Sequence, residues 1–319
     1  MNRRDFLAAA AAAPFALRAG TLLAAPAPLA IVTCDTEARV AAVDVASGRV
    51  LRSVAVLPGP RSVESVAGRY AVVAHTAYGA VTVLDGATLA ARHVLRDFEE
   101  PRYTAAHPDG RHAFVTDSGR AELVAVDVLA GRIAGRVRLV EWPRHVSLDA
   151  AGRTLWVGLG NASDRVAVVD VSSPARPRLV RYVRPPFGAH DVGWLPGGRA
   201  VWVTSGDRGA MAVYDARTHE PLRRLTAGAP PQHVTFGAGV AYVTSGEDAT
   251  LSVHSPRDGR LLRTISVPVG SYNVQEGYGR VLTPSLDRGT LAILDAGGVL
   301  VREVRVATSS HDACFVARS

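Results

Sequence analysis

The chain has 319 residues, of which 48% are hydrophobic and 20% are charged. This composition supports a packed core and excludes global disorder. The formal net charge is +7 and all 36 basic residues are arginine, but the sequence has no basic run and no RNA-binding motif, so nucleic acid is not expected as a partner. Two cysteines are too few for a disulfide-rich scaffold.

Residues 1–27 have the features of an export signal. The segment 3–7, R-R-D-F-L, precedes an alanine-rich apolar run and a group of small residues at 24–27. The pattern resembles a twin-arginine signal, which implies that a folded protein is exported to the periplasm or secreted. The apolar run is too short and too rich in alanine for a membrane span, so after cleavage near Ala25 we expect no integral membrane protein. The alternative is an uncleaved anchor.

From residue 28 onward the chain repeats with a period of about 40 residues. Each repeat holds an apolar segment that ends in aspartate, or once in serine. These positions are Asp44, Asp85, Asp127, Asp170, Asp215, Ser255 and Asp295. Each repeat also contains four short valine-rich runs separated by Gly, Pro, Asp and Ser, which indicates strands rather than helices. Four antiparallel strands per repeat predict an all-β, seven-bladed β-propeller over residues 28–319.

The two ends of this region predict how the ring closes. Residues 28–59 supply only three strands, and the segment His311–Ala317 supplies one more. Pairing of that last segment with Leu29–Thr33 would complete a blade and remove an open sheet edge. The aspartates that end the repeats are expected to bond to turn amides rather than to do chemistry.

The repeat resembles that of the YVTN-type seven-bladed propellers. The resemblance rests on P-D-G-R-H-A-F-V-T at 108–116, A-V-W-V-T-S-G at 200–206 and V-A-Y-V-T-S-G at 240–246, and it extends over nearly all of residues 28–319. It implies the propeller fold. It leaves the function open, because this scaffold is shared by binding proteins, lactonases, lyases and haem, quinone and copper enzymes.

Alignment of the repeats places one residue of each blade at the start of its innermost strand, beside the mouth of the central channel. These residues are Ser62, Tyr103, His145, His190, His233, Asn273 and His311. Four of the seven are histidines, in the contexts P-R-H-V, G-A-H-D-V, P-Q-H-V and S-S-H-D. Side chains that are distant in the sequence are therefore expected to meet around the axis.

A second set of residues is expected at the same face, where the following strand ends. These residues are Cys34, His75, Asp117, Gly160, Ser205, Ser245 and Ser285. Imidazole, thiolate and carboxylate groups near one axis form a ligand set for copper or zinc. The candidate metal ligands are therefore His145, His190, His233, His311, Cys34 and His75. The alternatives are histidines that bond to loops and water as part of the repeat, and histidines that act in acid–base catalysis.

These features predict an exported, monomeric propeller that binds a small molecule, a metal or a periplasmic protein at its channel mouth. The sequence has no standard catalytic motif and no CxxCH haem-attachment motif. One alternative is an enzyme that uses the same mouth and resembles either the lactonases or the metal- and haem-dependent oxidoreductases. The other is a protein-interaction platform, which a histidine-rich channel disfavours.

Overall fold

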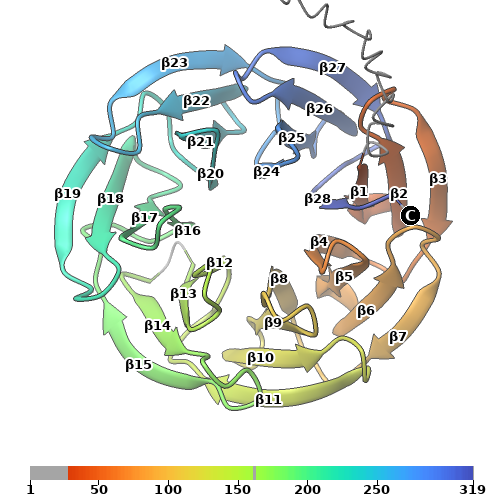
Figure 1. Cartoon of the computed structure of the whole chain (residues 1–319), viewed down its shortest axis with the longest axis horizontal. Coiled ribbons are helices and arrows are strands. Elements are labelled where there is room, and N and C mark those ends of the chain that lie inside the picture. Colours follow the sequence, from red (N-terminus) through yellow and green to blue (C-terminus); the bar gives the residue numbers. More distant parts are fainter. Residues whose placement is uncertain (1–27, 161–162, 319) are drawn as a thin grey trace, which may run out of the picture.

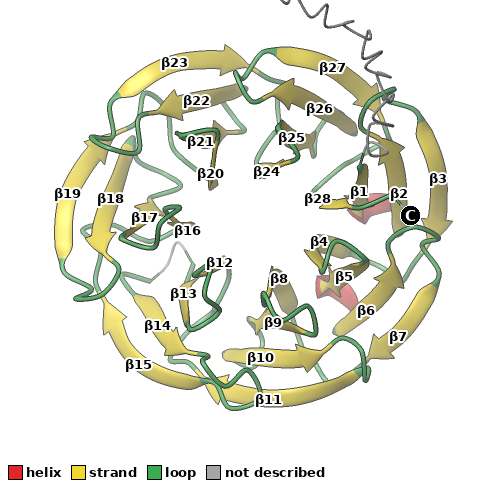
Figure 2. Cartoon of the chain, viewed as in Figure 1, coloured by secondary structure: helices red, strands yellow, loops and turns green. Residues whose placement is uncertain are grey.

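The computed structural model describes residues 28–160 and 163–318 as seven antiparallel sheets of four strands each. The sheets surround a central axis as the blades of a propeller (Figure 1), which confirms the predicted all-β fold. Almost all regular structure is strand (Figure 2), apart from the short 3-10 helices η1 (Asp35–Glu37) and η2 (Thr76–Tyr78) in the described chain. Residues 1–27, where the export signal is predicted, lie outside the described residues, as do 161–162 and 319.

The blades follow one another along the chain, and the first blade borrows its inner strand from the C-terminus. Blade 1 contains β28 (Ala313–Val316), β1 (Leu29–Cys34), β2 (Arg39–Asp44) and β3 (Val50–Ala55). Blade 2 contains β4 (Pro60–Val66), β5 (Tyr70–His75), β6 (Ala80–Asp85) and β7 (Ala91–Leu95). Blade 3 contains β8 (Pro101–Ala106), β9 (His112–Asp117), β10 (Glu122–Asp127) and β11 (Arg132–Arg138).

The remaining four blades have the same order of strands, from the axis outward. Blade 4 contains β12 (Val146–Leu148), β13 (Thr154–Gly158), β14 (Val166–Asp170) and β15 (Arg178–Val183). Blade 5 contains β16 (Val192–Trp194), β17 (Ala200–Thr204), β18 (Ala210–Asp215) and β19 (Pro221–Thr226). Blade 6 contains β20 (Val234–Gly237), β21 (Val240–Ser245), β22 (Thr250–His254) and β23 (Leu261–Ser266). Blade 7 contains β24 (Gln275–Gly277), β25 (Arg280–Ser285), β26 (Thr290–Asp295) and β27 (Leu300–Arg305).

The ring closes as the sequence predicts. Strand β28 pairs antiparallel with β1, with Ala313 opposite Val32 and Val316 opposite Leu29. The two strands lie side by side in Figure 1 although they come from opposite ends of the chain. The last strand begins at Ala313 rather than at His311, but the backbone N–H of His311 still donates to the carbonyl of Thr33 at 2.9 Å.

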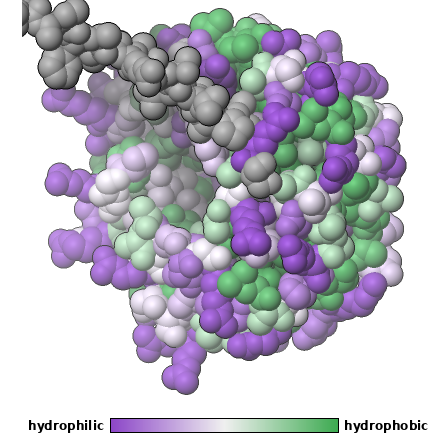
Figure 3. Space-filling view, turned by 45° about the vertical axis from the view of Figure 1, so that its right-hand side comes forward, coloured by the Kyte–Doolittle hydropathy of each residue, from purple (hydrophilic) through white to green (hydrophobic). Residues whose placement is uncertain are grey.

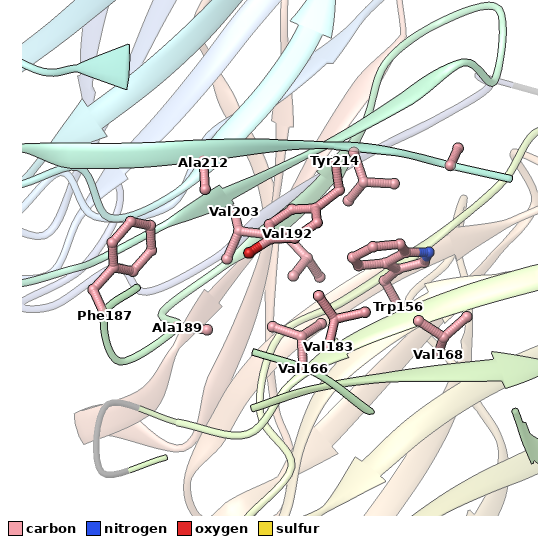
Figure 4. Close-up of a cluster of buried hydrophobic side chains, with 12 residues drawn as sticks. Trp156, Val166, Val168, Val183, Phe187, Ala189, Val192, Val203, Ala212 and Tyr214 are labelled. Carbon is pink, nitrogen blue, oxygen red and sulfur yellow. The ribbon is translucent and has the colours of Figure 1, made fainter. Parts of the chain in front are cut away.

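The hydrophobic core is divided among the interfaces between neighbouring blades. Successive side chains of a strand point to opposite faces of its sheet. The apolar residues of one strand therefore pack against both neighbouring blades. In the cluster between blades 4 and 5, shown in Figure 4, the Trp156 ring of β13 lies 5.8 Å from the Tyr214 ring of β18. Both rings are fully buried, and burial of a side chain of this size contributes on the order of 3 kcal/mol to the free energy of unfolding.

The aspartates that end the repeats hold turns, as predicted. The Asp44 carboxylate accepts a hydrogen bond from the backbone N–H of Ser47 at 2.7 Å, and that of Asp85 accepts one from Thr88 at 3.1 Å. Such bonds favour the ionised carboxylate and keep the pKa of Asp44 below its ordinary value.

Threonines of the second strands of blades 1, 3, 5 and 6 bond to the next blade and position the channel mouth. The hydroxyl of Thr116 donates to the carbonyl of Arg144 at 2.7 Å, and that of Thr204 donates to the carbonyl of Gln232 at 2.7 Å. The accepting residues stand at the entrance to the inner strands, so these bonds fix their backbones.

On the face shown in Figure 3, hydrophilic side chains project from the surface and apolar areas lie between them. None of the helices in the described part of the chain has the length and apolar character that crossing a membrane requires.

Candidate functional site

Backbone hydrogen bonds define which residues of different blades are equivalent, and they correct the predicted alignment. In blade 6, the N–H of Thr244 donates to the carbonyl of His233 at 3.0 Å. In blade 5, the N–H of Thr204 donates to the carbonyl of Asp191, also at 3.0 Å. Asp191 is therefore the equivalent of His233, and His190 stands one residue closer to the mouth.

The same correction applies to blade 1, where the N–H of Thr33 donates to the carbonyl of Asp312 at 2.9 Å. Asp312, and not His311, is the equivalent of His233. The expectation that four histidines share one position was therefore wrong. Both exceptions carry His-Asp before the strand, whereas blades 4 and 6 carry a histidine directly before it.

Two successive rings of residues consequently surround the axis. The channel ring comprises Ser62, Tyr103, His145, Asp191, His233, Asn273 and Asp312, and all of these residues line a cavity of about 300 Å³. The mouth ring comprises Arg61, Arg102, Arg144, His190, Gln232, Tyr272 and His311. All of its members except Arg102 line a second cavity, of about 530 Å³. Tyr103 and His233 line both cavities and so stand between them.

Three of the six predicted metal ligands come together where the rings meet. The nitrogen ligand atoms of His145, His190 and His233 all lie within 4.8 Å of one another. The His145 ring lies 4.3 Å from that of His233 and 4.6 Å from that of His190, and Tyr103 packs against His145 at 3.9 Å, all measured between centroids. The three histidines, called the His triad below, belong to the consecutive blades 4, 5 and 6.

The protonation state of His145 follows from its hydrogen bond. Its Nδ1 lies against the backbone carbonyl of His190, which can only accept, so Nδ1 carries the proton. Burial holds the pKa of His145 well below its ordinary value, and the positive charge of Arg144 acts in the same direction, so the ring is neutral. Its Nε2 is therefore an unprotonated nitrogen, buried and without a hydrogen-bond partner among the described residues.

His233 and His190 are also neutral. The Nδ1 of His233 lies 3.5 Å from the Asp191 carboxyl oxygen Oδ2, and burial holds the pKa of His233 well below its ordinary value. Burial lowers the pKa of His190 to about 3, and the guanidinium groups of Arg144 and Arg61 contribute to the decrease. Neutral imidazole is the form that binds metals.

The distances leave room for a metal that draws the rings inward. Tetrahedral coordination at about 2.1 Å places ligand nitrogens about 3.4 Å apart. One ligand nitrogen of each histidine of the His triad lies within 4.8 Å of the other two, so binding of a metal requires the rings to move closer together. A carboxyl or carbonyl oxygen beside Nδ1 of His233 and His145 is the usual support for a histidine that binds metal through Nε2.

The other three predicted ligands have different surroundings and do not join this group of described residues. The Nδ1 of His311 lies 3.4 Å from Oδ2 of Asp35, within reach of the mouth cavity. The Nδ1 of His75 bonds to the carbonyl of Leu57 at 2.8 Å, in the loop that leads into its own blade. Burial raises the pKa of the Cys34 thiol to about 12, so that group is not a thiolate at neutral pH.

Four members of the second predicted set, His75, Asp117, Ser245 and Ser285, bond to interblade loops. The Asp117 carboxylate accepts hydrogen bonds from the backbone N–H groups of Glu99 and Glu100, both at 2.9 Å. The Ser285 hydroxyl donates to the carbonyl of Val269 at 2.6 Å. These side chains secure the loops between blades.

Buried carboxyl groups of the channel were not predicted from the sequence. Asp191 and Asp312 each accept a bond from the inner strand of the next blade, from the N–H groups of Val234 at 2.9 Å and Val63 at 3.0 Å. Burial raises the pKa of Asp191, Asp312 and Glu64 to about 7 in each case. The His-Asp pairs in the sequence were the available signal for the first two.

Comparison with known proteins agrees with the class that this geometry defines, a seven-bladed β-propeller. No protein-family model and no curated protein matches the sequence. A functionally unknown protein from Desulfotomaculum acetoxidans is similar in structure, with a TM-score of 0.79 and 9% identity over 91% of this chain and 99% of that one.

Two further similar structures carry functional names. A protein from Bacteroides uniformis, proposed to be a 6-phosphogluconolactonase, has a TM-score of 0.74 and 14% identity over 91% of this chain and 99% of its own. The dihydro-heme d1 dehydrogenase NirN has a TM-score of 0.64 and 16% identity over 89% of this chain and 74% of its own. At these identities the likeness shows the fold alone.

Proposed function

We propose that this protein is an exported β-propeller that binds copper or zinc on His145, His190 and His233 at the mouth of its channel. The observation that carries the proposal is the unprotonated Nε2 of His145, which is buried without a partner among the described residues. Two more neutral imidazoles supply ligand atoms within 4.8 Å. An unsatisfied buried nitrogen costs free energy, which a metal ion would recover.

A metal held by three imidazoles retains an open coordination position. Three-histidine sites suit zinc and copper, and the fourth position is then available to water or to a small ligand. The mouth cavity of about 530 Å³, which His190 and His233 line, is large enough for such a ligand. The binding function thus includes a small molecule as well as the metal.

Calorimetric titration of the purified protein with Cu(II) and with Zn(II) tests this function. We expect one equivalent of at least one of these metals to bind at micromolar or lower concentration. The variants His145→Ala and His233→Ala should each weaken binding at least 100-fold. The variant His93→Ala, which changes a histidine of the outer strand β7, is the matched control and should bind as wild type does. Absence of stoichiometric binding, or equal binding by all variants, would contradict the metal site.

A second candidate function is acid–base catalysis by His233. The carboxyl oxygen of Asp191 lies 3.5 Å from Nδ1 of His233 and can orient the neutral imidazole, which would then take a proton through Nε2. The names of two similar structures suggest lactone hydrolysis and haem-linked oxidation as the reactions to assay. Metal-free protein that hydrolyses a lactone, and loses that activity in His233→Gln, would favour this function over metal binding.

Export is the remaining part of the proposal. It is supported by the segment 3–7, R-R-D-F-L, by the alanine-rich run that follows and by the small residues at 24–27. Export of a folded chain would allow a metal site to be filled before transport. We also propose that the repeats of this chain are of the YVTN type, on the basis of the segments 108–116, 200–206 and 240–246.

A further inference from the structure

Three arginines of consecutive blades stand next to one another in the mouth ring. Arg61 precedes the channel residue of blade 2, Arg102 that of blade 3 and Arg144 that of blade 4. Burial, and the positive charges of Arg144 and Arg61, lower the pKa of Arg102. Arg61 and Arg144 line the same mouth cavity, and Arg102 and Arg144 both lie over the ring of Trp142.

These guanidinium groups lack the partners that partly buried arginines normally have. The Nε atoms of Arg61, Arg102 and Arg144 are buried and have no hydrogen-bond partner among the described residues. Within the same residues, neither Arg61 nor Arg144 forms an ion pair, and Arg102 reaches only Glu100, at 3.6 Å. Leaving several such charges unpaired is unfavourable, because desolvation is not offset by an opposite charge.

A tryptophan holds two of the arginines in place. The guanidinium carbon of Arg102 lies 4.4 Å from the centre of the Trp142 ring, and that of Arg144 lies 5.1 Å from it. Contact with the face of an indole stabilises a cation and restricts its side chain. The donors are therefore partly ordered before any ligand arrives, which reduces the entropy lost on binding.

We propose that the mouth cavity binds the carboxylate or phosphate group of a small molecule on Arg61 and Arg144, with Arg102, stacked on Trp142, adding positive charge behind them. The planar guanidinium group matches both anions with two parallel hydrogen bonds. Arg61 and Arg144 line the cavity of about 530 Å³ together with Gln232 and Tyr272, which offer polar contacts to the rest of the ligand. Asp207 and Glu247 of blades 5 and 6 line the same cavity and disfavour a second anionic group there. This site does not depend on the metal proposed above.

Calorimetry on protein depleted of metal with a chelating resin tests the anion site by itself. The probes are inorganic phosphate, citrate and, as a neutral compound, glucose. We expect one equivalent of phosphate or citrate to bind with a submillimolar Kd that rises with salt concentration, and glucose not to bind. Whether phosphate or citrate binds more tightly identifies the anionic group. Binding should also change the fluorescence of Trp142, and the variant Trp142→Phe should lose that change.

The variants Arg61→Gln and Arg144→Gln should each weaken anion binding at least tenfold. The matched control is Arg178→Gln, which changes an exposed arginine on β15 that pairs with Asp170 at 2.7 Å. If a glutamine variant does not fold, Arg61→Lys keeps the charge but not the planar fork and should weaken binding several-fold. Failure of both anions to bind below about 10 mM, equal binding of glucose, or unchanged binding in folded variants would overturn the proposal. Because no metal is present, these outcomes are separate from those of the metal titration.

Discussion

The imidazole of His145 donates a hydrogen bond through Nδ1 to the backbone carbonyl of His190 in the neighbouring blade. One bond therefore serves two purposes. It links blade 4 to blade 5, and it leaves Nε2 of His145 as the atom with a free lone pair. The geometry of the channel site therefore depends on a contact that joins two neighbouring blades.

Ring closure predicts the effect of a C-terminal truncation. Deleting residues 311–319 removes β28 and exposes the edge of β1, so we expect the melting temperature to fall by at least about 15 °C. Deleting only residues 318–319 removes the half-exposed ion pair between Arg318 and Asp44. This deletion should change the melting temperature by no more than a few degrees. Similar melting curves for the long truncation and the full chain would show that the ring closes differently.

The partly buried carboxyl of Glu64, which lines the channel cavity, predicts an unusual dependence of stability on pH. Burial raises its pKa to about 7, above its unfolded value, so its contribution to stability is present at low pH and is lost as the pH rises through 7. Glutamine imitates the protonated form. Relative to wild type, Glu64→Gln should therefore gain about 2 kcal/mol of unfolding free energy between pH 5 and pH 8.

Denaturant unfolding at the two pH values measures this difference. The control variant Glu303→Gln changes an exposed position of β27. It should shift the free energy of unfolding equally at both pH values. If the difference between Glu64→Gln and wild type does not change with pH, the carboxyl of Glu64 is ionised across the whole range.

The arginines and the His triad predict coupling between metal and anion. Arg144 lowers the pKa of all three imidazoles, and the same positive charge opposes binding of a metal cation. In the absence of added anion, Arg144→Gln should bind copper or zinc on the order of fivefold more tightly than wild type. When the binding of two ligands is coupled, each ligand changes the affinity for the other by the same factor. Phosphate should therefore tighten metal binding to wild type and not to Arg144→Gln. Weaker metal binding in the folded variant would refute this electrostatic account.

The proposed export signal predicts the fate of a conservative double substitution. Arg3→Lys together with Arg4→Lys keeps both charges but removes the twin arginine. Fractionation of cells that express the full chain should then find the precursor in the cytoplasm. An unchanged periplasmic yield would mean that the segment directs another route.

The sequence was sufficient for the fold because the repeat carries the information. Spacing of the aspartate-ended runs indicated the number of blades, and the unpaired segment near His311 indicated the closure. The site was harder to predict from the sequence, because an error of one residue in the alignment of the repeats changes which cavity a side chain lines. His190 and Asp191 illustrate this point, since alignment on the following valine would have placed them correctly.

Other features of the site depend on the direction in which each side chain points, and the pattern of strands in the sequence does not specify that direction. Cys34 and His75 end their strands at the mouth face, but the twist of the blade turns His75 toward a loop carbonyl. Arg61, Arg102 and Arg144 were not recognised because arginine is so abundant in this chain that three single residues far apart in sequence carried no signal. Only closure of the ring brings them together.

X-ray absorption spectroscopy of the protein loaded with one equivalent of zinc or copper tests the central claim most directly. A metal on the His triad should show about three imidazole nitrogens at about 2.0–2.1 Å and no sulfur scatterer, because Cys34 is a buried thiol away from the His triad. The His145→Ala variant should show the loss of imidazole ligands. A sulfur ligand at about 2.3 Å, or a metal bound by oxygen alone, would contradict the account.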